Sequence, residues 1–334
     1  MHAVKISAVV PVYRGEDTLQ AALRSLLEQD VENLETIVLD DGSPDDSRQI
    51  AHWIASQETD KAIHILSHPN RGLAATLNRG ISVARGEYIA RQDQDDIVLP
   101  GRLAKQMAFL DANPDIAMVG TWAQIYQGNV PSQRYHRHPA HNDALQLELM
   151  FDNPFVHSSV MIRTEVLRQI GGYCEDKARQ PPEDYELWSR IARQHRIANL
   201  PEILTIYREF SGSMSRGGDS PFASNVSRIS AENLFWLLES CGSYSPQDCR
   251  ELASIYHATG SPSTPPTLTR IKAKQMLRRV AIIIGGEPSG WTKEFQASYR
   301  RIAAHLDRCY IRMLVPPSLR EPVRWLKNLI SGNR

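Results

Sequence analysis

Little in this 334-residue sequence marks a protein that is secreted, spans a membrane or binds nucleic acid. Its four cysteines form no CxxC pair and no histidine cluster completes a zinc pattern, so we expect small buried thiols. No stretch approaches the ~20 apolar residues that cross a bilayer, and the short run Ile6–Val12 lacks the features of a signal peptide. Lys plus Arg and Asp plus Glu both number 38, which disfavours a strongly basic nucleic-acid binder. These absences predict a cytoplasmic protein and leave open a peripheral position at the inner face of a membrane.

The first 120 residues alternate between two hydrophobic periods. Short, nearly continuous apolar runs, typical of strands buried on both faces, are separated by segments whose apolar residues recur at helical spacing. This alternation predicts an α/β fold with a mainly parallel sheet flanked by helices. We interpret the polar stretch 127–141 as a loop or irregular ribbon, 197–200 and 203–207 as two short strands, and the chain beyond 220 as helices. The expected strands of the first part are 6–12, 36–39, 62–66, 87–90 and 116–119.

Two acidic clusters follow expected strands: Asp40–Asp41 after the second, and QDQDDI, residues 92–97, after the fourth. In parallel α/β sheets ligands bind beyond the carboxyl ends of the strands, so both clusters fall where a site is expected. Three carboxylates within four residues repel one another unless a cation lies among them. Oxygen ligands favour a hard ion such as Mg²⁺ or Mn²⁺. The alternative is a solvated acidic turn in which Asp96 caps a helix.

Other charged residues each allow a functional and a structural interpretation. Asp41 either binds a uracil-like base or a ribose, or it stabilises a turn. Arg71, in the NRG sequence at a helix start, either lies beside a diphosphate or belongs to a turn and N-cap. Glu183 and Asp184 open a helix, a position compatible both with a general base at the mouth of a site and with helix-capping acids.

Two ring-bearing residues near these carboxylates are equally ambiguous. Trp188 lies one helical turn beyond Asp184, so it either lines an acceptor pocket or packs in the core. His157, in the sequence HSSVMI, either faces an acceptor or phosphate or is a satisfied histidine at a strand end.

Taken together, the segments that carry these residues resemble the family 2 glycosyltransferases, a large inverting family with the GT-A fold. They occur in the family's order, cover roughly residues 5 to 210, and leave the chain after about 220 outside the resemblance. The resemblance implies a GT-A catalytic domain at 1–215, with a Rossmann-like nucleotide-sugar half at about 1–120 and an acceptor half at about 121–215, followed by a helical C-terminal region at 220–334. The segments are VVPVYRGEDTLQAALRSLLEQD, IVLDDGSPDDS, NRGLAATLNRGISVARGEYIARQDQDDIVLPGRL, SSVMIRTEVLRQIGGY and PPEDYELWSRIA.

The resemblance also implies roles for individual residues. Asp93-Gln94-Asp95 looks like the family's DXD metal motif, with Asp95 as the more direct ligand. Asp184, in the ED pair, looks like the catalytic base, with Glu183 in support or facing the acceptor. Trp188 and His157 would lie on the acceptor side. The residues placed at the donor nucleotide are Pro11, Val12, Tyr13, Asp41, Arg71 and Asp93.

The implied reaction moves a sugar from a nucleotide-diphosphate donor, a UDP-sugar first of all, to the hydroxyl of a glycan or lipid-linked acceptor, in cell-surface polysaccharide or glycolipid synthesis. Asp184 would take the hydroxyl proton in one in-line displacement that inverts the anomeric carbon. Mn²⁺ or Mg²⁺ would neutralise the departing diphosphate. Because the base must be ionised near neutral pH, we expect a pKa of Asp184 well below 7.

Other functions remain compatible with the sequence. A nucleotidyltransferase also uses metal-binding carboxylates on an α/β sheet, but a glycine-rich, lysine-containing phosphate loop is missing near the N-terminus. A nucleotide-sugar-binding or scaffold module on a catalytically retired GT-A fold is disfavoured by the intact Asp93, Asp95 and Asp184. No GxGxxG follows the first strand, which argues against a nicotinamide-dependent enzyme.

The segment REPVRWLKNLI, residues 320–330, places basic residues beside apolar ones. Such a helix either lies on an anionic membrane surface, which would suit a lipid-linked acceptor, or packs on the preceding domain with its charged face outward.

Overall fold

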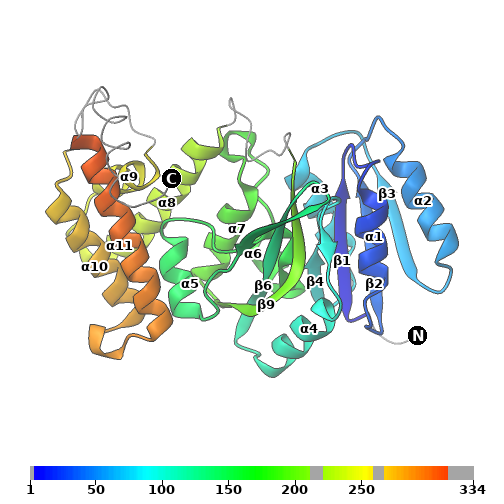
Figure 1. The fold of residues 1–334 in the computed structure, drawn as a ribbon, viewed down its shortest axis with the longest axis horizontal. Coiled ribbons are helices and arrows are strands. Elements are labelled where there is room, and N and C mark those ends of the chain that lie inside the picture. The colour runs from blue at the N-terminus through cyan, green and yellow to red at the C-terminus, as the bar shows by residue number, and fades with distance from the viewer. Residues whose placement is uncertain (1–3, 211–220, 259–266, 315–334) are drawn as a thin grey trace. The chain divides into compact units, whose positions relative to one another are not determined.

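A computed structural model describes residues 4–210, 221–258 and 267–314 (Figure 1). One nine-stranded sheet runs in the order β3-β2-β1-β4-β8-β6-β9-β5, with β7 paired to β6. Segment 320–330 lies outside the described residues, so its expected helix stays a prediction. The strands are β1 Ile6–Val12, β2 Leu34–Asp40, β3 Ala62–Ser67, β4 Tyr88–Arg91, β5 Ile97–Val98, β6 Ile116–Gln127, β7 Val130–His136, β8 Met161–Arg163 and β9 Arg196–Glu209.

Strands β1 to β4 form the parallel part of the sheet, as the sequence predicts. Every residue of β1 is buried, because helices cover this part of the sheet. Helix α3 packs closely on β1 at Gly80, where an added Cβ atom would lie 2.6 Å from a methyl carbon of Val9. The helices of this part are α1 Leu19–Leu27, α2 Ser47–Gln57, α3 Leu73–Val83 and α4 Arg102–Ala112.

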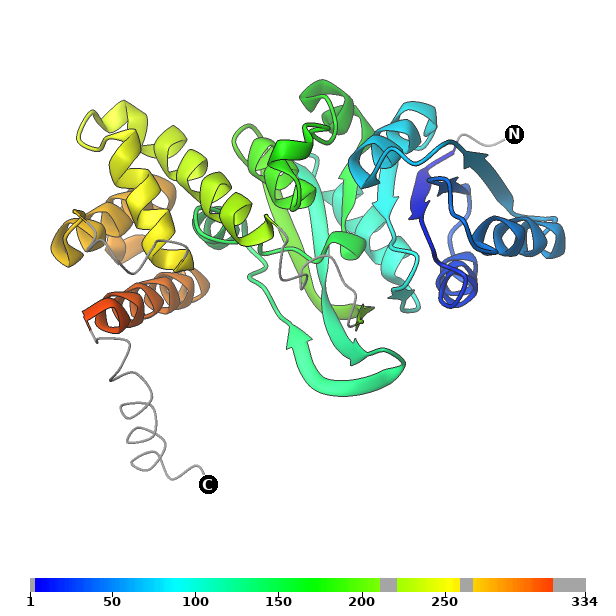
Figure 2. The ribbon, with the colours of Figure 1, turned by 90° about the horizontal axis from the view of Figure 1, so that it is seen from above.

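Beyond β4 the sheet becomes mixed. Strand β8 pairs antiparallel with both β4 and β6, whereas β6 and β9 run parallel. The polar stretch after residue 127 contains β7, which forms a hairpin with β6 (Figure 2). The two short strands expected at 197–200 and 203–207 are one continuous strand, β9, because register shifts opposite β6 absorb the irregularity between them. The helices here are α5 Asn142–Leu149, α6 Thr164–Ile170 and α7 Glu183–Ala192.

The chain divides into two compact units. The sheet and the helices around it form the first, and Gln146–Asp152 with the chain from Ala223 onward form the second. The sequence places this boundary at about 215–220, but Gln146–Asp152, expected in the first part, packs in the second. There the side-chain amide of Asn233 donates to the Leu149 carbonyl at 2.8 Å. Its helices are α8 Phe222–Leu238, α9 Pro246–His257, α10 Arg270–Gly285 and α11 Lys293–Leu314.

The helical unit has a hydrophobic core of its own, which includes Leu234, Leu252, Leu277, Phe295 and Leu306. None of the helices in the described part of the chain combines the length and apolar character needed to cross a membrane.

Candidate active site

The loops after β1, β2 and β4 meet at one edge of the sheet. Val12 lies opposite Asp40 in the β1–β2 register, and Val9 lies opposite Arg91 in the β1–β4 register. The Tyr13 amide donates to Gln94 Oε1 at 2.7 Å, and Gln94 Nε2 donates back to the Tyr13 carbonyl at 2.9 Å. The parallel arrangement therefore brings both acidic clusters to the edge at which ligands bind in such folds.

The carboxylate of Asp41 is hydrogen-bonded to the backbone of a neighbouring loop. Its carboxylate accepts hydrogen bonds from the Arg71 amide at 2.7 Å and the Gly72 amide at 3.0 Å, and the residue is 4% exposed. Gly72 has a φ of 92°, a conformation that favours glycine. Asp41 thus fixes the turn that starts α3, the structural role that its sequence allows, and its contact with a base stays a prediction. The Arg71 side chain is exposed.

The three residues expected to flank the nucleotide base differ in accessibility. Pro11 and Val12 are buried within β1. Tyr13 is 40% exposed, and the Arg14 guanidinium lies over its ring at 5.3 Å from the centroid. Of the three, Tyr13 is therefore the residue whose side chain is accessible, and its contact with a nucleotide stays a prediction.

Residues 92–96, between β4 and β5, form an acidic loop. Its three carboxylates lie in different environments. Asp96 is 1% exposed and accepts hydrogen bonds from the Ser158 hydroxyl and from the Arg208 amide. Burial raises the pKa of Asp96 well above its usual range. Both of its oxygens are thus occupied by the fold, so Asp96 anchors the loop to segments far away in the sequence.

Asp93 and Asp95 are the two remaining carboxylates of the loop. Asp93 is partly exposed and accepts a hydrogen bond from Arg91 Nη2 at 2.5 Å. Burial and the neighbouring charge of Asp93 raise the pKa of Asp95 to about 7. A cation between them would offset the repulsion that raises this pKa.

The carboxylates of this loop fit a divalent ion that takes only some of its coordinating ligands from the protein. Within the described ranges, no group of three or more His, Cys, Asp or Glu side chains is arranged to hold a metal. Asp93 and Asp95 therefore offer two carboxylates at most. Mg²⁺ is commonly bound by one or two carboxylates together with substrate phosphates and water.

A buried polar layer supports the acidic loop. Arg102, Gln92 and Gln106 are each 0% exposed. Arg102 donates to Gln92 Oε1 at 3.1 Å, to the Ser158 carbonyl at 2.6 Å and to the Arg91 carbonyl at 2.8 Å, and its Nε donates to Gln106 Oε1 at 3.1 Å. Because these bonds join β4, α4 and the 157–159 segment, they define the backbone path on either side of the loop.

Helix α7 places a second pair of carboxylates near the loop. Asp184 accepts hydrogen bonds from Asn153 Nδ2 at 2.8 Å and from the Tyr185 amide at 2.7 Å. Burial raises the pKa of Asp184 to about 6, closer to neutrality than the sequence led us to expect, although the carboxyl is still mostly ionised at pH 7. Burial and the charge of Asp184 raise the pKa of Glu183 to about 7. Asp93 also raises the pKa of Asp184, so the two acidic groups interact electrostatically.

The prediction that Trp188 lines an acceptor pocket is wrong. Trp188 is 0% exposed, and its ring packs against His157, Phe155 and Tyr173 at centroid distances of 5.8, 6.5 and 6.3 Å. Its position one turn into α7 directs it to the core, the structural role that the sequence also allowed.

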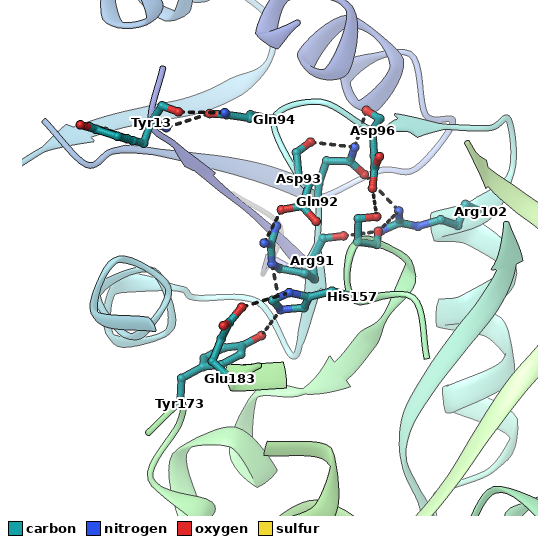
Figure 3. A network of polar contacts seen from close by, with 11 residues as sticks. Tyr13, Arg91, Gln92, Asp93, Gln94, Asp96, Arg102, His157, Tyr173 and Glu183 are labelled. Atoms are coloured by element: carbon teal, nitrogen blue, oxygen red, sulfur yellow. Dashed lines mark hydrogen bonds and ion pairs between the residues drawn. The ribbon is translucent and has the colours of Figure 1, made fainter. Parts of the chain in front are cut away.

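His157 is mostly buried, with 13% of its side chain exposed, and its contacts in the structure are with the protein. Its Nε2 accepts from Arg91 Nε at 3.2 Å and lies 2.9 Å from the Tyr173 hydroxyl, and its Nδ1 lies 3.8 Å from Glu183 Oε1 (Figure 3). Burial and Arg91 lower the pKa of His157 well below its usual range. The structure thus places His157 in this polar network, and its acceptor-side role stays a prediction.

Three residues of the site escape prediction from the sequence: Arg91, Asn153 and Tyr173. A signal existed only for Arg91, which follows the apolar strand residues and directly precedes the acidic cluster. A charged residue at the end of a buried strand needs a partner, and the nearest acids lie two to five residues away. Asn153 and Tyr173 come from loops whose approach to α7 depends on the tertiary fold.

Comparison with known structures identifies the fold. The chain has a TM-score of 0.60 with Staphylococcus aureus TarS 1–349 in complex with UDP-GlcNAc, over 91% of this chain and 92% of that chain, at 19% sequence identity. The architecture is that of the GT-A glycosyltransferases, so the predicted fold class is confirmed.

Sequence comparison identifies the family. The model of "Glycosyl transferase family 2" matches residues 7–171. The putative glycosyltransferase EpsE of Bacillus subtilis (strain 168) is 34% identical over 214 residues, which are 64% of this chain and 76% of that protein. The O-antigen biosynthesis glycosyltransferase WbnJ of Escherichia coli is 31% identical over 208 residues, 61% of this chain and 79% of that protein. The chain belongs to glycosyltransferase family 2, as the five sequence segments predict.

Proposed function

We propose that this chain transfers a sugar from a UDP-sugar to an acceptor hydroxyl, with inversion at the anomeric carbon. The observation that carries this proposal is the position of Asp184. It is the second residue of α7, it is oriented by Asn153 and by its own helix, and the charge of Asp93 in the acidic loop contributes to its raised pKa. A base on one side and a diphosphate site on the other are what a single displacement between two substrates requires.

Asp184 acts as the general base of this reaction. Each of its oxygens accepts one hydrogen bond from the protein, and a carboxylate oxygen has a further lone pair for a substrate proton. As the acceptor hydroxyl attacks the anomeric carbon, its proton passes to Asp184 and the bond to the nucleotide diphosphate breaks. One attack gives inversion, and positive charge develops on the sugar as in glycoside hydrolysis.

Asp93 and Asp95 hold a divalent ion, Mn²⁺ or Mg²⁺, in this proposal. When bound, the ion supplies Lewis-acid stabilisation of the negative charge that the departing diphosphate gains. Asp96 is not available for this role, because Ser158 and Arg208 occupy its carboxylate. Tyr13, held against the acidic loop through Gln94, is placed to contact the nucleotide.

The comparisons support a nucleotide sugar as donor and a glycan as acceptor. TarS, with the same fold, was crystallised with UDP-GlcNAc. WbnJ is named for O-antigen biosynthesis, a polysaccharide pathway. Because specificity depends on individual contacts and not on fold, we extend only the donor class and the glycan class of acceptor to this chain.

A donor screen tests the proposal. The purified chain is given UDP-, GDP- and dTDP-sugars with Mn²⁺ or Mg²⁺, and the readouts are thermal shift and release of nucleoside diphosphate. We expect one UDP-sugar to stabilise the protein and to be slowly hydrolysed, since ligands that bind only the folded state raise its stability. Chelator and Asp95→Ala are both expected to abolish the effect, whereas Asp115→Ala, which removes an exposed carboxylate paired with Arg196, leaves it intact.

Three results would contradict parts of this proposal. Release of pyrophosphate in place of nucleoside diphosphate would indicate a nucleotidyltransferase. Folded protein that binds a donor but transfers to no acceptor and hydrolyses nothing would indicate a retired fold. Full activity in the presence of chelator would contradict the metal requirement but would still support the transferase activity.

We also propose that the helical unit contacts an anionic membrane surface. Residues 270–314 contain ten Lys and Arg against three Asp and Glu, although the whole chain is neutral. On α11 the exposed residues Arg300, Ala304, Arg308 and Ile311 are spaced to share one face. Ile311 is 50% exposed, and Asp307 is already paired with Arg270 and Lys274. Basic and apolar groups on one exposed face suit lipid headgroups and their acyl boundary.

Vesicle cosedimentation checks this surface. We expect the chain to bind vesicles containing phosphatidylserine but not neutral vesicles. The double variant Arg300→Glu/Arg308→Glu should weaken binding at least about tenfold, because each basic residue near such a surface contributes ~1 kcal/mol. Arg48→Glu, on an exposed position of α2, is the control. Binding that survives the double variant but is lost on deletion of residues 320–334 would assign the contact to the C-terminal segment instead.

A further inference from the structure

Arg91 is a buried cation in a site otherwise rich in carboxylates. It ends β4 and is 2% exposed. Its Nη2 donates to Asp93 Oδ1 at 2.5 Å on one side, and its Nε donates to His157 Nε2 at 3.2 Å on the other. Figure 3 shows the guanidinium between Asp93 and the group formed by His157, Glu183 and Tyr173.

The contacts of His157 define its tautomer. Because Nε2 accepts a hydrogen bond from Arg91, this nitrogen carries no proton, and the ring proton is on Nδ1. Nδ1 lies 3.8 Å from Glu183 Oε1. This separation is too long for a hydrogen bond, and the direct contact of His157 with α7 is the edge-on packing of its ring against Trp188, at a centroid distance of 5.8 Å.

Arg91 differs from the other buried arginine of the site. All three nitrogens of the Arg102 guanidinium donate to protein acceptors, so the fold uses Arg102 fully. Nη1 of Arg91 is buried and has no hydrogen-bond partner among the described residues. A buried donor left without a partner destabilises the fold, so its retention in a native structure calls for a functional explanation.

We propose that Arg91 is a positioning residue that couples the two halves of the site: it orients Asp93 toward the donor diphosphate and, through His157, orients the start of α7 that carries Glu183 and Asp184. This inference rests on the proposed transferase function. It requires the planar fork of arginine, because two partners on different segments must be held at once. A lysine keeps the charge but cannot hold both in fixed directions.

The first test compares Arg91→Lys with Arg190→Lys. Arg190 is a partly buried arginine on α7 that is paired with Glu186 and two backbone carbonyls outside the site. We expect Arg91→Lys to lower kcat about 10- to 100-fold, because a displacement of ~1 Å at the reacting groups has effects of this size. It should also reduce the thermal shift that the UDP-sugar produces with Mn²⁺. Arg190→Lys should leave both readouts within about twofold of the wild type.

The second test is a double-mutant cycle of Asp93→Asn and His157→Phe, two positions joined through Arg91. We expect their effects on kcat/KM to be non-additive by about 2- to 100-fold, and to become additive in an Arg91→Lys background. A purely structural arginine would not produce this loss of coupling. If Arg91→Lys does not fold, the cycle in the wild-type background still decides, since additive effects there exclude coupling through Arg91.

The outcomes separate this inference from the proposed function. If the wild-type protein neither binds nor turns over any donor, the proposed transferase function and the role of Arg91 are both contradicted. Suppose instead that the wild type is active. If Arg91→Lys then behaves like the wild type, or if the effects of Asp93→Asn and His157→Phe are additive, the role of Arg91 is contradicted and the transferase function stands.

Discussion

Replacing Asp184 by asparagine is expected to lower kcat about 10²- to 10⁴-fold, the range that general-base catalysis contributes. Asparagine keeps the size of the side chain but cannot take the acceptor proton. Donor binding should change little, because Asp184 contacts Asn153 and its own helix and not the loop that holds Asp93 and Asp95. Single-turnover transfer and calorimetric titration of the donor measure the two quantities separately.

The pH profile provides the control for this assignment. The ionised form of Asp184 is the active one, and its pKa is raised to about 6, so kcat/KM should fall as the pH drops through about 6. This acidic limb should disappear in the residual activity of Asp184→Asn. Near-normal turnover of the asparagine variant, or an unchanged acidic limb, would assign the base elsewhere, with Glu183 as the next candidate.

Replacing Arg102 by methionine should cost about 4 kcal/mol or more in the free energy of unfolding, because a buried acceptor left without its donor costs ~1–3 kcal/mol. Methionine fills a similar volume but donates nothing. Gln92 Oε1, Gln106 Oε1 and the carbonyls of Arg91 and Ser158 would each lose a buried hydrogen bond. Thermal unfolding monitored on the full chain should show a fall in Tm of about 10 °C.

Arg48→Met is the matched control, because Arg48 lies on an exposed position of α2 and surface changes usually stay within ±0.5 kcal/mol. If Arg102→Met were as stable as the control, the four acceptors must find other donors, and the polar layer would not support the acidic loop in the way described.

Much of the fold follows from hydrophobic periodicity. The buried runs of β1, β2 and β4 and the helical spacing of α1 and α3 fix the parallel part of the sheet, and the acids that follow these strands then fall at its carboxyl edge. The sequence divides β9 into two strands, because Pro201 and Glu202 resemble a turn, whereas pairing with β6 holds both halves in one strand. Helix α5 is not predicted from the sequence, since its polar start hides Leu147, which belongs to the core of the helical unit.

The candidate site was predictable where function rests on residue type and position in a motif, and less so where it rests on packing. Asp93, Asp95 and Asp184 could be named from the sequence. Spacing alone cannot show whether Trp188 points inward, because a tryptophan in the first turns of a helix suits the core and a pocket equally well. The sequence indicates the local partner of Arg91, Asp93, but not its contact with His157, which lies 66 residues away.

The acidic loop is held at both ends before any substrate arrives. Gln94 fastens it to the end of β1, and Asp96 fastens it to Ser158 and Arg208. The conformational entropy of this loop is therefore lost during folding and not during binding. A donor that meets a pre-organised loop keeps more of its interaction energy as affinity, and each catalytic cycle starts from the same arrangement of carboxylates.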